Sequence, residues 1–207
     1  GYWMERKQYW KHLIQDNGES RQGTLAPKGS LVGSYNNGVS ILDPVLAEVC
    51  VKWFAPLQAN CFDCFAGDSV FGYVCDYLGN SFTGIELREE QARLNNQRLQ
   101  NSKSKYICDD GQNVLEHIEE NSQDFLFSCP PYFDLEVYSD LENDASNQKE
   151  YADFIQILDN AFSNSIKALK EDRFACIVVG DIRDKKGFYY DFMGDIKRIF
   201  KRNNVFL

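Results

Sequence analysis

The chain has 207 residues, of which 43% are hydrophobic and 26% charged, a composition typical of one globular domain. Only five residues are Pro and no apolar run approaches the ~20 residues that cross a bilayer, which argues against a disordered or membrane-spanning chain. The formal net charge of −9 excludes a basic surface spread over the whole molecule, so nucleic-acid binding would need a local basic patch, a partner or a missing segment.

The first 38 residues form a predicted extension that differs in composition from the rest. Residues 1–15 are aromatic and basic, and four side chains recur there at helical spacing: Tyr2, Arg6, Tyr9 and Leu13. Residues 16–38 are rich in Gly, Ser and Asn, which predicts a loop. We therefore expect a helix and loop over 1–38 and a catalytic domain over 39–207. The absent initiator Met and an end resembling a strand start predict a fragment cut at both ends.

From residue 39 onward, short apolar segments alternate with amphipathic ones. Asp43-Pro44 is a helix start signal, with Asp as N-cap and Pro at the first helical position. The residues expected on the buried face of this helix are Val45, Leu46, Val49, Cys50 and Trp53. Strands are predicted over 60–65, 82–87, 105–108, 124–128 and 174–179. Further helices are predicted over 70–78, 89–99, 113–118 and 150–170.

This alternation predicts an α/β fold with a mostly parallel, doubly wound sheet that lacks its last strands at the C-terminal end. In such sheets, ligands bind beyond the carboxyl ends of the strands. The motifs that carry chemistry in this chain all follow predicted strands, so we expect them to meet at one edge of the sheet.

The first three strand ends predict a nucleoside cofactor. Ala66-Gly67-Asp68-Ser69 is a glycine turn that opens a helix and lets the backbone approach a ligand. Glu86 follows about 20 residues later, where a carboxylate can hold ribose hydroxyls. Asp109-Asp110 ends the third strand, where a carboxylate can accept a hydrogen bond from an adenine amino group. The turn lacks G-x-G-x-x-G, which disfavours NAD, and lacks the P-loop pattern, which excludes that type of phosphate site.

The fourth predicted strand ends in Phe127-Ser128-Cys129-Pro130-Pro131-Tyr132. Adjacent prolines stiffen the backbone and remove two N–H donors, so the carbonyl of Cys129 or Pro130 can face a ligand. Tyr132 offers a flat ring for stacking on a base, and Ser128 can contribute one position earlier. An isolated Pro-Pro pair is more often a rigid turn. Its place beside the cofactor features favours a functional interpretation.

These motifs resemble those of the DNA amino-methyltransferases that make N6-methyladenine or N4-methylcytosine. The family's cofactor motif, D-P-F-x-G-S-G-T, corresponds to DCFAGDSV at residues 63–70. Its catalytic motif, [DNS]-P-P-[YFW], corresponds to CPPY at residues 129–132. The stretches 129–139 and 179–189 resemble a group of phage and prophage DNA methylases. The resemblance covers residues 39–207.

The resemblance implies a Rossmann-like methyltransferase fold that binds S-adenosyl-L-methionine and flips a base out of duplex DNA. The residues that it assigns to the cofactor are Asp63, Phe65, Ala66, Gly67, Asp68, Ser69, Glu86 and Asp110. Those that it assigns to the reacting amino group are Cys129, Pro130, Pro131 and Tyr132. Glu86 would bind the ribose, Asp110 the adenine, and Tyr132 would stack on the flipped base. Positioning of the amino group would supply most of the rate.

Two positions depart from the family pattern. Asp68-Ser69 replaces Ser-Gly, which makes the turn bulkier and more acidic. Cys129 replaces Asp, Asn or Ser, and a thiol is a weak hydrogen-bond partner whose size favours cytosine N4 slightly. A nucleophilic role for Cys129 is disfavoured, because cytosine C5 methylases place Cys after Pro and this chain offers no obvious activating base nearby. The single C-x-x-C pair, Cys61 and Cys64, predicts no metal site.

Two other functions stay open at this point. The net charge favours a methyltransferase for an amino group of RNA, protein or a small molecule. The two departures favour an inactive protein that keeps the fold and binds nucleic acid. The basic residues available for DNA are Arg6, Lys7, Lys11, Arg183, Lys185 and Lys186. Seven cysteines at irregular spacing predict free thiols in the cytoplasm, here of a bacterial or phage-infected cell.

Overall fold

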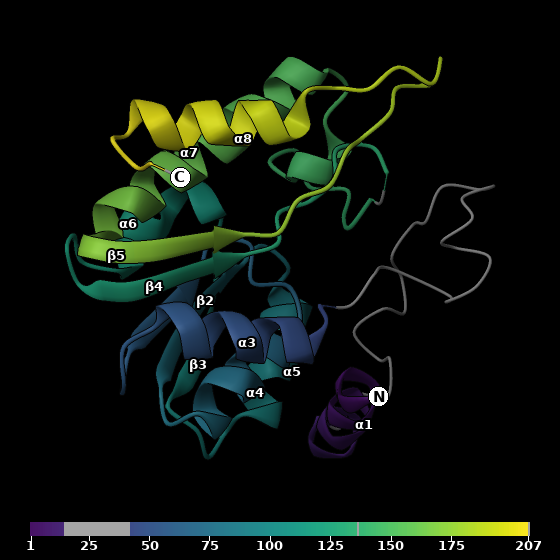
Figure 1. The fold of residues 1–207 in the computed structure, drawn as a ribbon. Helices are drawn as coiled ribbons and strands as arrows, with labels where there is room; N and C mark the ends of the chain where they lie inside the picture. Colours follow the sequence, from purple (N-terminus) through teal and green to yellow (C-terminus); the bar gives the residue numbers. More distant parts are fainter. Residues whose placement is uncertain (15–41, 136, 207) are drawn as a thin grey trace.

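The computed structural model describes residues 1–14, 42–135 and 137–206 (Figure 1). Its centre is a five-stranded sheet in the order β3-β2-β1-β4-β5, in which every neighbouring pair is parallel. The strands are β1 (Asn60–Asp63), β2 (Ser81–Glu86), β3 (Ser104–Cys108), β4 (Gln123–Ser128) and β5 (Leu169–Ile177). The predicted doubly wound α/β fold is thereby confirmed. The predicted loop over 16–38, and the boundary at its end, lie outside the described residues.

Helices cover both faces of the sheet (Figure 1). On one face lie α3 (Pro44–Phe54), α4 (Val70–Tyr77) and α5 (Glu89–Arg98). On the other lie α6 (Val114–His117), α7 (Tyr151–Ala168) and α8 (Phe192–Arg202). Two single turns of 3-10 helix, η2 (Gly111–Asn113) and η3 (Ala145–Asn147), precede α6 and α7, and the N-terminal α1 (Tyr2–Leu13) packs against α3. Among the described residues, no helix combines the length and apolarity needed to span a bilayer.

The central strand β4 shows why consecutive residues of a strand are apolar here, with no alternation of polar and apolar side chains. Phe125 and Phe127 lie in the core under α3 and α4, whereas Leu126 between them lies in the core under α7. Successive strand residues point to opposite faces, and both faces of this sheet are covered by helices. A continuous apolar run is therefore what a central strand of this fold requires.

The helix α3 begins where its sequence predicts, but its buried face differs from the prediction. The Asp43 carboxylate accepts a hydrogen bond from the amide of Val45 at 2.9 Å, which confirms the N-cap. The side chain of Trp53 was expected in the core and is 74% exposed instead. The carboxylate of Glu48, only 3% exposed, lies on the buried face. The predicted burial of Trp53 is therefore wrong.

The reason for this difference is the docking of α1 onto α3. Arg6 donates two hydrogen bonds to Glu48, at 2.7 and 2.8 Å, while Trp10 and Lys52 donate at 2.8 and 2.6 Å. Burial alone would raise the pKa of Glu48, but the hydrogen bonds from Arg6, Lys52 and Trp10 outweigh it and lower the pKa to about 2. A carboxylate that accepts four hydrogen bonds can lie inside the protein, so the side of α3 that carries Glu48 is the buried one.

Helix α8 was not predicted, although its sequence carries a helical pattern. Phe192, Ile196 and Ile199 are buried at spacings of four and three residues, where one face of a helix repeats. The strand expected at the end of the chain is absent from residues 203–206, of which 203–204 form a turn after α8.

Candidate active site

A cavity of about 400 Å³ lies at the carboxyl ends of the strands, within the size range of small-molecule sites. The strand order reverses at β1, which has β2 on one side and β4 on the other, and this is where sheets of this class bind ligands. Every predicted site residue except Ser69 lines the cavity: Asp63, Phe65, Ala66, Gly67, Asp68, Glu86, Asp110, Cys129, Pro130, Pro131 and Tyr132. Their assigned roles stay predictions.

The glycine turn between β1 and α4 owes its shape to two residues. Gly67 adopts φ of +57°, which residues with a Cβ adopt only at a cost, and its carbonyl accepts a hydrogen bond from Asn95 at 2.8 Å. Asp68 accepts one from the amide of Val70 at 2.9 Å, a side-chain turn at the start of α4. Ser69 is 1% exposed and lies behind the cavity wall. Asp68, which differs from the residue of the family motif, thus has a local structural role in the turn.

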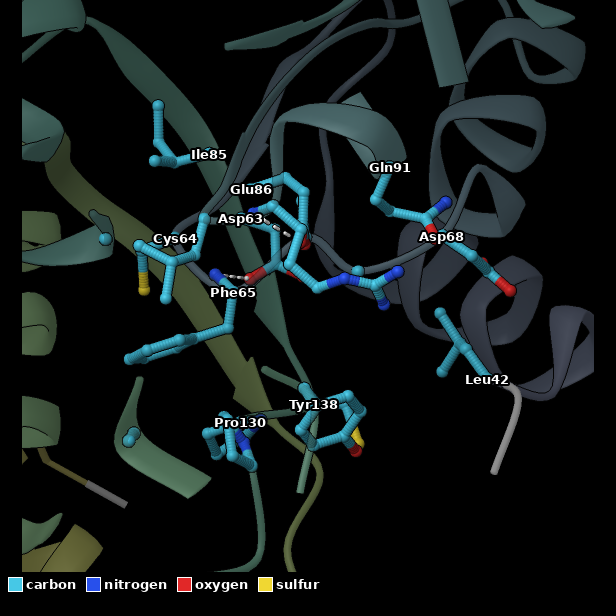
Figure 2. A pocket seen from close by; sticks show the side chains of 18 of the residues that line it. Leu42, Asp63, Cys64, Phe65, Asp68, Ile85, Glu86, Gln91, Pro130 and Tyr138 are labelled. Atoms are coloured by element: carbon cyan, nitrogen blue, oxygen red, sulfur yellow. Dashed lines mark hydrogen bonds between the residues drawn. The ribbon is translucent and has the colours of Figure 1, made fainter. Parts of the chain in front are cut away.

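Two buried carboxylates, Asp63 and Glu86, stand at the ends of β1 and β2 and line the cavity (Figure 2). Asp63 accepts a hydrogen bond from the amide of Phe65 at 2.8 Å, and Glu86 accepts one from the amide of Arg88 at 2.9 Å. Burial raises the pKa of each carboxyl to about 7, and the nearby charge of Asp144 adds to the effect at Glu86. Near neutral pH both can therefore exchange a proton, and a ligand that donates hydrogen bonds would favour the ionised forms.

Asp110 has a structural role beside its predicted contact with adenine. Its carboxylate accepts hydrogen bonds from the amide and side chain of Gln112, at 2.9 and 3.0 Å, and from Asn143 at 2.8 Å. The following Gly111 passes so close to β1 that an added Cβ would overlap the carbonyl oxygen of Cys64. Asn143, which also lines the cavity, is thus joined to Asp110.

The proline turn after β4 forms the wall nearest β5. The Tyr132 hydroxyl donates to the carbonyl of Val178 at 3.4 Å, and its ring meets that of Phe192 edge-on at 5.9 Å. Cys129 is half-buried and lines the cavity, whereas Ser128 is fully buried and does not. Contacts with Val178, just after β5, and with Phe192 of α8 therefore hold the ring of Tyr132, which also lines the cavity.

Several lining residues come from segments that the sequence analysis did not connect with the site. They are Leu42, Asp43, Leu46, Arg88, Gln91, Tyr138, Asn143, Asp144 and Ala145. Figure 2 shows Leu42 and Gln91 on one side of the view and Tyr138 near Pro130 on another. Asp144 organises the loop around it, because its carboxylate accepts hydrogen bonds from Ser139 at 2.6 Å and from the amide of Ser146 at 2.8 Å. The D-x-S pattern of a side-chain-capped turn was the available signal.

Comparison with known proteins establishes the fold. No protein-family profile and no curated protein matches the chain. A TehB-like S-adenosylmethionine-dependent methyltransferase from Corynebacterium glutamicum matches with a TM-score of 0.51 and 17% identity over 96% of this chain and 82% of its own. A Clostridium thermocellum protein described as an rRNA methylase matches with a TM-score of 0.55 and 12% identity over 79% and 82%.

A third match was solved with a bound ligand. The phosphoethanolamine N-methyltransferase 2 of Haemonchus contortus, in complex with S-adenosylhomocysteine, has a TM-score of 0.52 and 16% identity over 77% of this chain and 36% of its own. At such identities the likeness concerns the fold alone. The chain therefore has the fold of S-adenosylmethionine-dependent methyltransferases.

Proposed function

We propose that the protein is an S-adenosylmethionine-dependent methyltransferase that modifies an exocyclic amino group of a DNA base, adenine N6 or cytosine N4. One observation carries the proposal. The turn Cys129-Pro130-Pro131-Tyr132 lines the same cavity as the glycine turn and Glu86. A group that could hold a target amine thus lies beside groups suited to the nucleoside part of a cofactor, on a methyltransferase fold.

The cavity fits S-adenosylmethionine on three grounds. Its volume is that of a small-molecule site, Gly67 opens the backbone at one wall, and Glu86 presents a buried carboxylate at the second strand end. Glu86 would accept hydrogen bonds from the ribose hydroxyls, and Asp110 would meet the adenine. The glycine turn would border the methionine part. When bound, the cofactor supplies a methyl group on a positively charged sulfur.

The contribution of the chain at the amino group is positioning. The carbonyl of Pro130 would accept a hydrogen bond from the amino group, since no N–H of Pro131 competes for that region. The ring of Tyr132, held by Val178 and Phe192, offers a surface for the flipped base. Fixing the amine in one orientation lowers the entropic part of the barrier. The nitrogen would form its bond to the methyl carbon as the carbon–sulfur bond breaks, and one proton of the amine would pass to water.

Transfer of labelled methyl groups from S-adenosylmethionine to DNA tests the proposal, and mass spectrometry of the nucleosides identifies the base. Tyr132→Ala should reduce transfer about tenfold to a hundredfold, because base stacking is worth ~1–3 kcal/mol. The exposed Tyr2 provides the control variant Tyr2→Ala, which should leave transfer unchanged. Cofactor binding by the wild-type protein without transfer to any DNA would overturn the proposal.

The net charge of −9 favours a second candidate, a methyltransferase for an amino group outside DNA. Transfer of the label to RNA, protein or a small amine, and not to DNA, would identify it. An inactive protein that keeps the fold is the third reading, supported by Cys129 and by Asp68-Ser69. Calorimetry that detects no binding of S-adenosylmethionine would favour that reading over both enzymes.

A further inference from the structure

The segment between β5 and α8 forms a short hairpin over residues 182–190. The amide of Asp184 donates to the carbonyl of Phe188 at 2.8 Å, and Arg183 pairs with Tyr189 in an antiparallel bridge. A two-stranded hairpin without further support is only marginally stable in water. The contacts at its tip and at its base therefore decide whether it holds one shape.

The tip of the hairpin is closed by its own backbone and one carboxylate. Asp184 accepts hydrogen bonds from the amides of Lys186 and Phe188, at 2.9 and 2.8 Å. Gly187 adopts φ of +89° and donates its amide to the carbonyl of Asp184 at 3.0 Å. The negative charge of Asp184 is thus engaged inside the turn, where backbone amides partly offset it.

The base of the hairpin packs against the aromatic cluster that follows the proline turn. Ile182 is 3% exposed in the core, and its carbonyl accepts a hydrogen bond from the amide of Tyr190 at 2.9 Å. The ring of Tyr190 stacks on Tyr151 at 4.2 Å and meets Phe133 edge-on at 5.8 Å. Phe133 directly follows Tyr132 in the chain. The hairpin is consequently anchored next to the predicted catalytic turn.

The outer surface of the hairpin combines exposed rings with cations. The side chains of Phe188 and Tyr189 are 70% and 60% exposed. The guanidinium of Arg183 lies 3.8 Å from the centre of the Tyr189 ring and also donates to its hydroxyl. Lys185 and Lys186 are exposed, and neither forms an ion pair with another described residue. Rings for stacking beside cations for phosphates are what proteins use to hold single-stranded nucleic acid.

The place of the hairpin relates this surface to the cavity. Figure 1 shows the β5–α8 segment extending past the arrowheads of β4 and β5, on the side to which the segment after β4 also leads. Within a chain whose net charge is −9, residues 182–190 carry three cations, one acid and two exposed rings. Nucleic-acid interfaces are more positive than other protein interfaces.

We propose that this hairpin is the DNA-binding element of the site, and that it holds the strand beside the flipped target base. Phe188 and Tyr189 stack against bases exposed by the flip, while Lys185 and Lys186 contact phosphates of the same strand. Arg183 holds the Tyr189 ring in place. This inference rests on the proposed function, because it takes the target to be a base of DNA.

Fluorescence anisotropy with a labelled duplex that carries one central mismatch tests the inference, since a mismatched base flips at less cost. The full chain is compared with the double variants Phe188→Ala/Tyr189→Ala and Lys185→Gln/Lys186→Gln. Lys197 and Lys201 are exposed on α8 and provide the matched control Lys197→Gln/Lys201→Gln. Thermal unfolding and binding of S-adenosylmethionine check that each variant folds.

The aromatic variant should lose DNA affinity roughly tenfold or more. The hairpin lysine variant should weaken binding and reduce the slope of log affinity against log salt by about 2, one for each lost phosphate contact. The α8 control should stay close to wild type. Equal losses in the two lysine variants would overturn the inference, and so would unchanged affinity of the hairpin variants or no DNA binding by the wild type.

The outcomes also separate the inference from the proposed function. Normal DNA methylation by the hairpin variants would overturn the inference and leave the function standing. DNA binding that depends on the hairpin, with no methyl transfer to DNA, would support DNA binding by the hairpin and overturn the proposed function. If the protein binds a single-stranded RNA of the same sequence more tightly than DNA, and this binding depends on the hairpin, the ligand of the hairpin is RNA.

Discussion

The substitution Glu86→Gln should change stability and cofactor binding in opposite directions. In the unliganded protein, burial raises the pKa of Glu86 from 4.5 to about 7. The folded state therefore holds its proton more tightly than the unfolded chain does. The stabilisation is fully present below pH 4.5 and is lost as pH rises through about 7. The difference between the two values corresponds to about 3 kcal/mol.

An uncharged Gln at this position removes the cost of burying a charge at pH 7.5. We expect the free energy of unfolding to rise by about 1–3 kcal/mol, the lower values applying if the new amide lacks a partner. The melting temperature should rise by roughly 2–4 °C for each kcal/mol. The slope of stability between pH 5 and pH 7 should fall without vanishing, because burial also raises the pKa of Asp63 to about 7.

Cofactor binding should weaken in the same variant. A carboxylate accepts hydrogen bonds at two oxygens and an amide at one, so one ribose hydroxyl would lose its partner. Hydrogen bonds to charged groups contribute ~1.5–3 kcal/mol, which predicts a loss of affinity of roughly tenfold to a hundredfold. Isothermal titration calorimetry at pH 7.5 measures this loss, and thermal unfolding from pH 5 to pH 8 measures the stability.

The exposed Glu89 undergoes the same chemical change in the control Glu89→Gln, which should alter neither quantity appreciably. Two results would refute the reasoning. A variant Glu86→Gln that is less stable at pH 7.5, with an unchanged pH slope, would show that burial does not dominate its pKa. A variant that binds the cofactor as tightly as wild type would remove Glu86 from the predicted ribose site.

Three further substitutions test the framework of the site. Gly67→Ala should lower stability by about 1–2 kcal/mol in thermal unfolding, because a Cβ is penalised at φ of +57°; an unchanged melting temperature would contradict this. Gly111→Ala should cost about 2 kcal/mol or more in urea unfolding, since its Cβ would overlap the Cys64 carbonyl, whereas a smaller loss would mean that the loop yields easily. Glu48→Gln should cost about 3 kcal/mol by leaving Arg6 underpaired, and trypsin should then cleave α1 faster than in the wild type. Because the pKa of Glu48 is lowered to about 2, this stabilisation is present above pH 4.5 and lost as pH falls towards 2; no acid dependence in the wild type would speak against it.

Local signals in the sequence were sufficient for the elements whose ends carry their own chemistry. Asp43 caps α3 as predicted, because an N-cap involves residues only two positions apart. The motifs after β1, β2, β3 and β4 meet in one cavity because the carboxyl ends of parallel strands share an edge of the sheet.

Predictions that depended on distant partners were less successful. The side of α3 that carries Glu48 is buried because Arg6 and Trp10 of another helix donate to it, 42 and 38 residues away. The hydrogen bond from Asn143 to Asp110 joins residues 33 positions apart. The residue pattern within either segment could not predict these contacts. Whether two side chains from different elements meet depends on how those elements pack.

The sequence by itself determined the class of fold, the order of the strands and the place of the motifs at strand ends, because hydrophobic period, caps and turns are local properties of the chain. Only the tertiary structure decided which side chains are enclosed together. It buried Asp63 and Glu86 and raised the pKa of each to about 7, brought the loop around Asp144 to the cavity, and packed the hairpin of residues 182–190 against Phe133. Burial and desolvation belong to the packed molecule, and the physical chemistry of the site arises there.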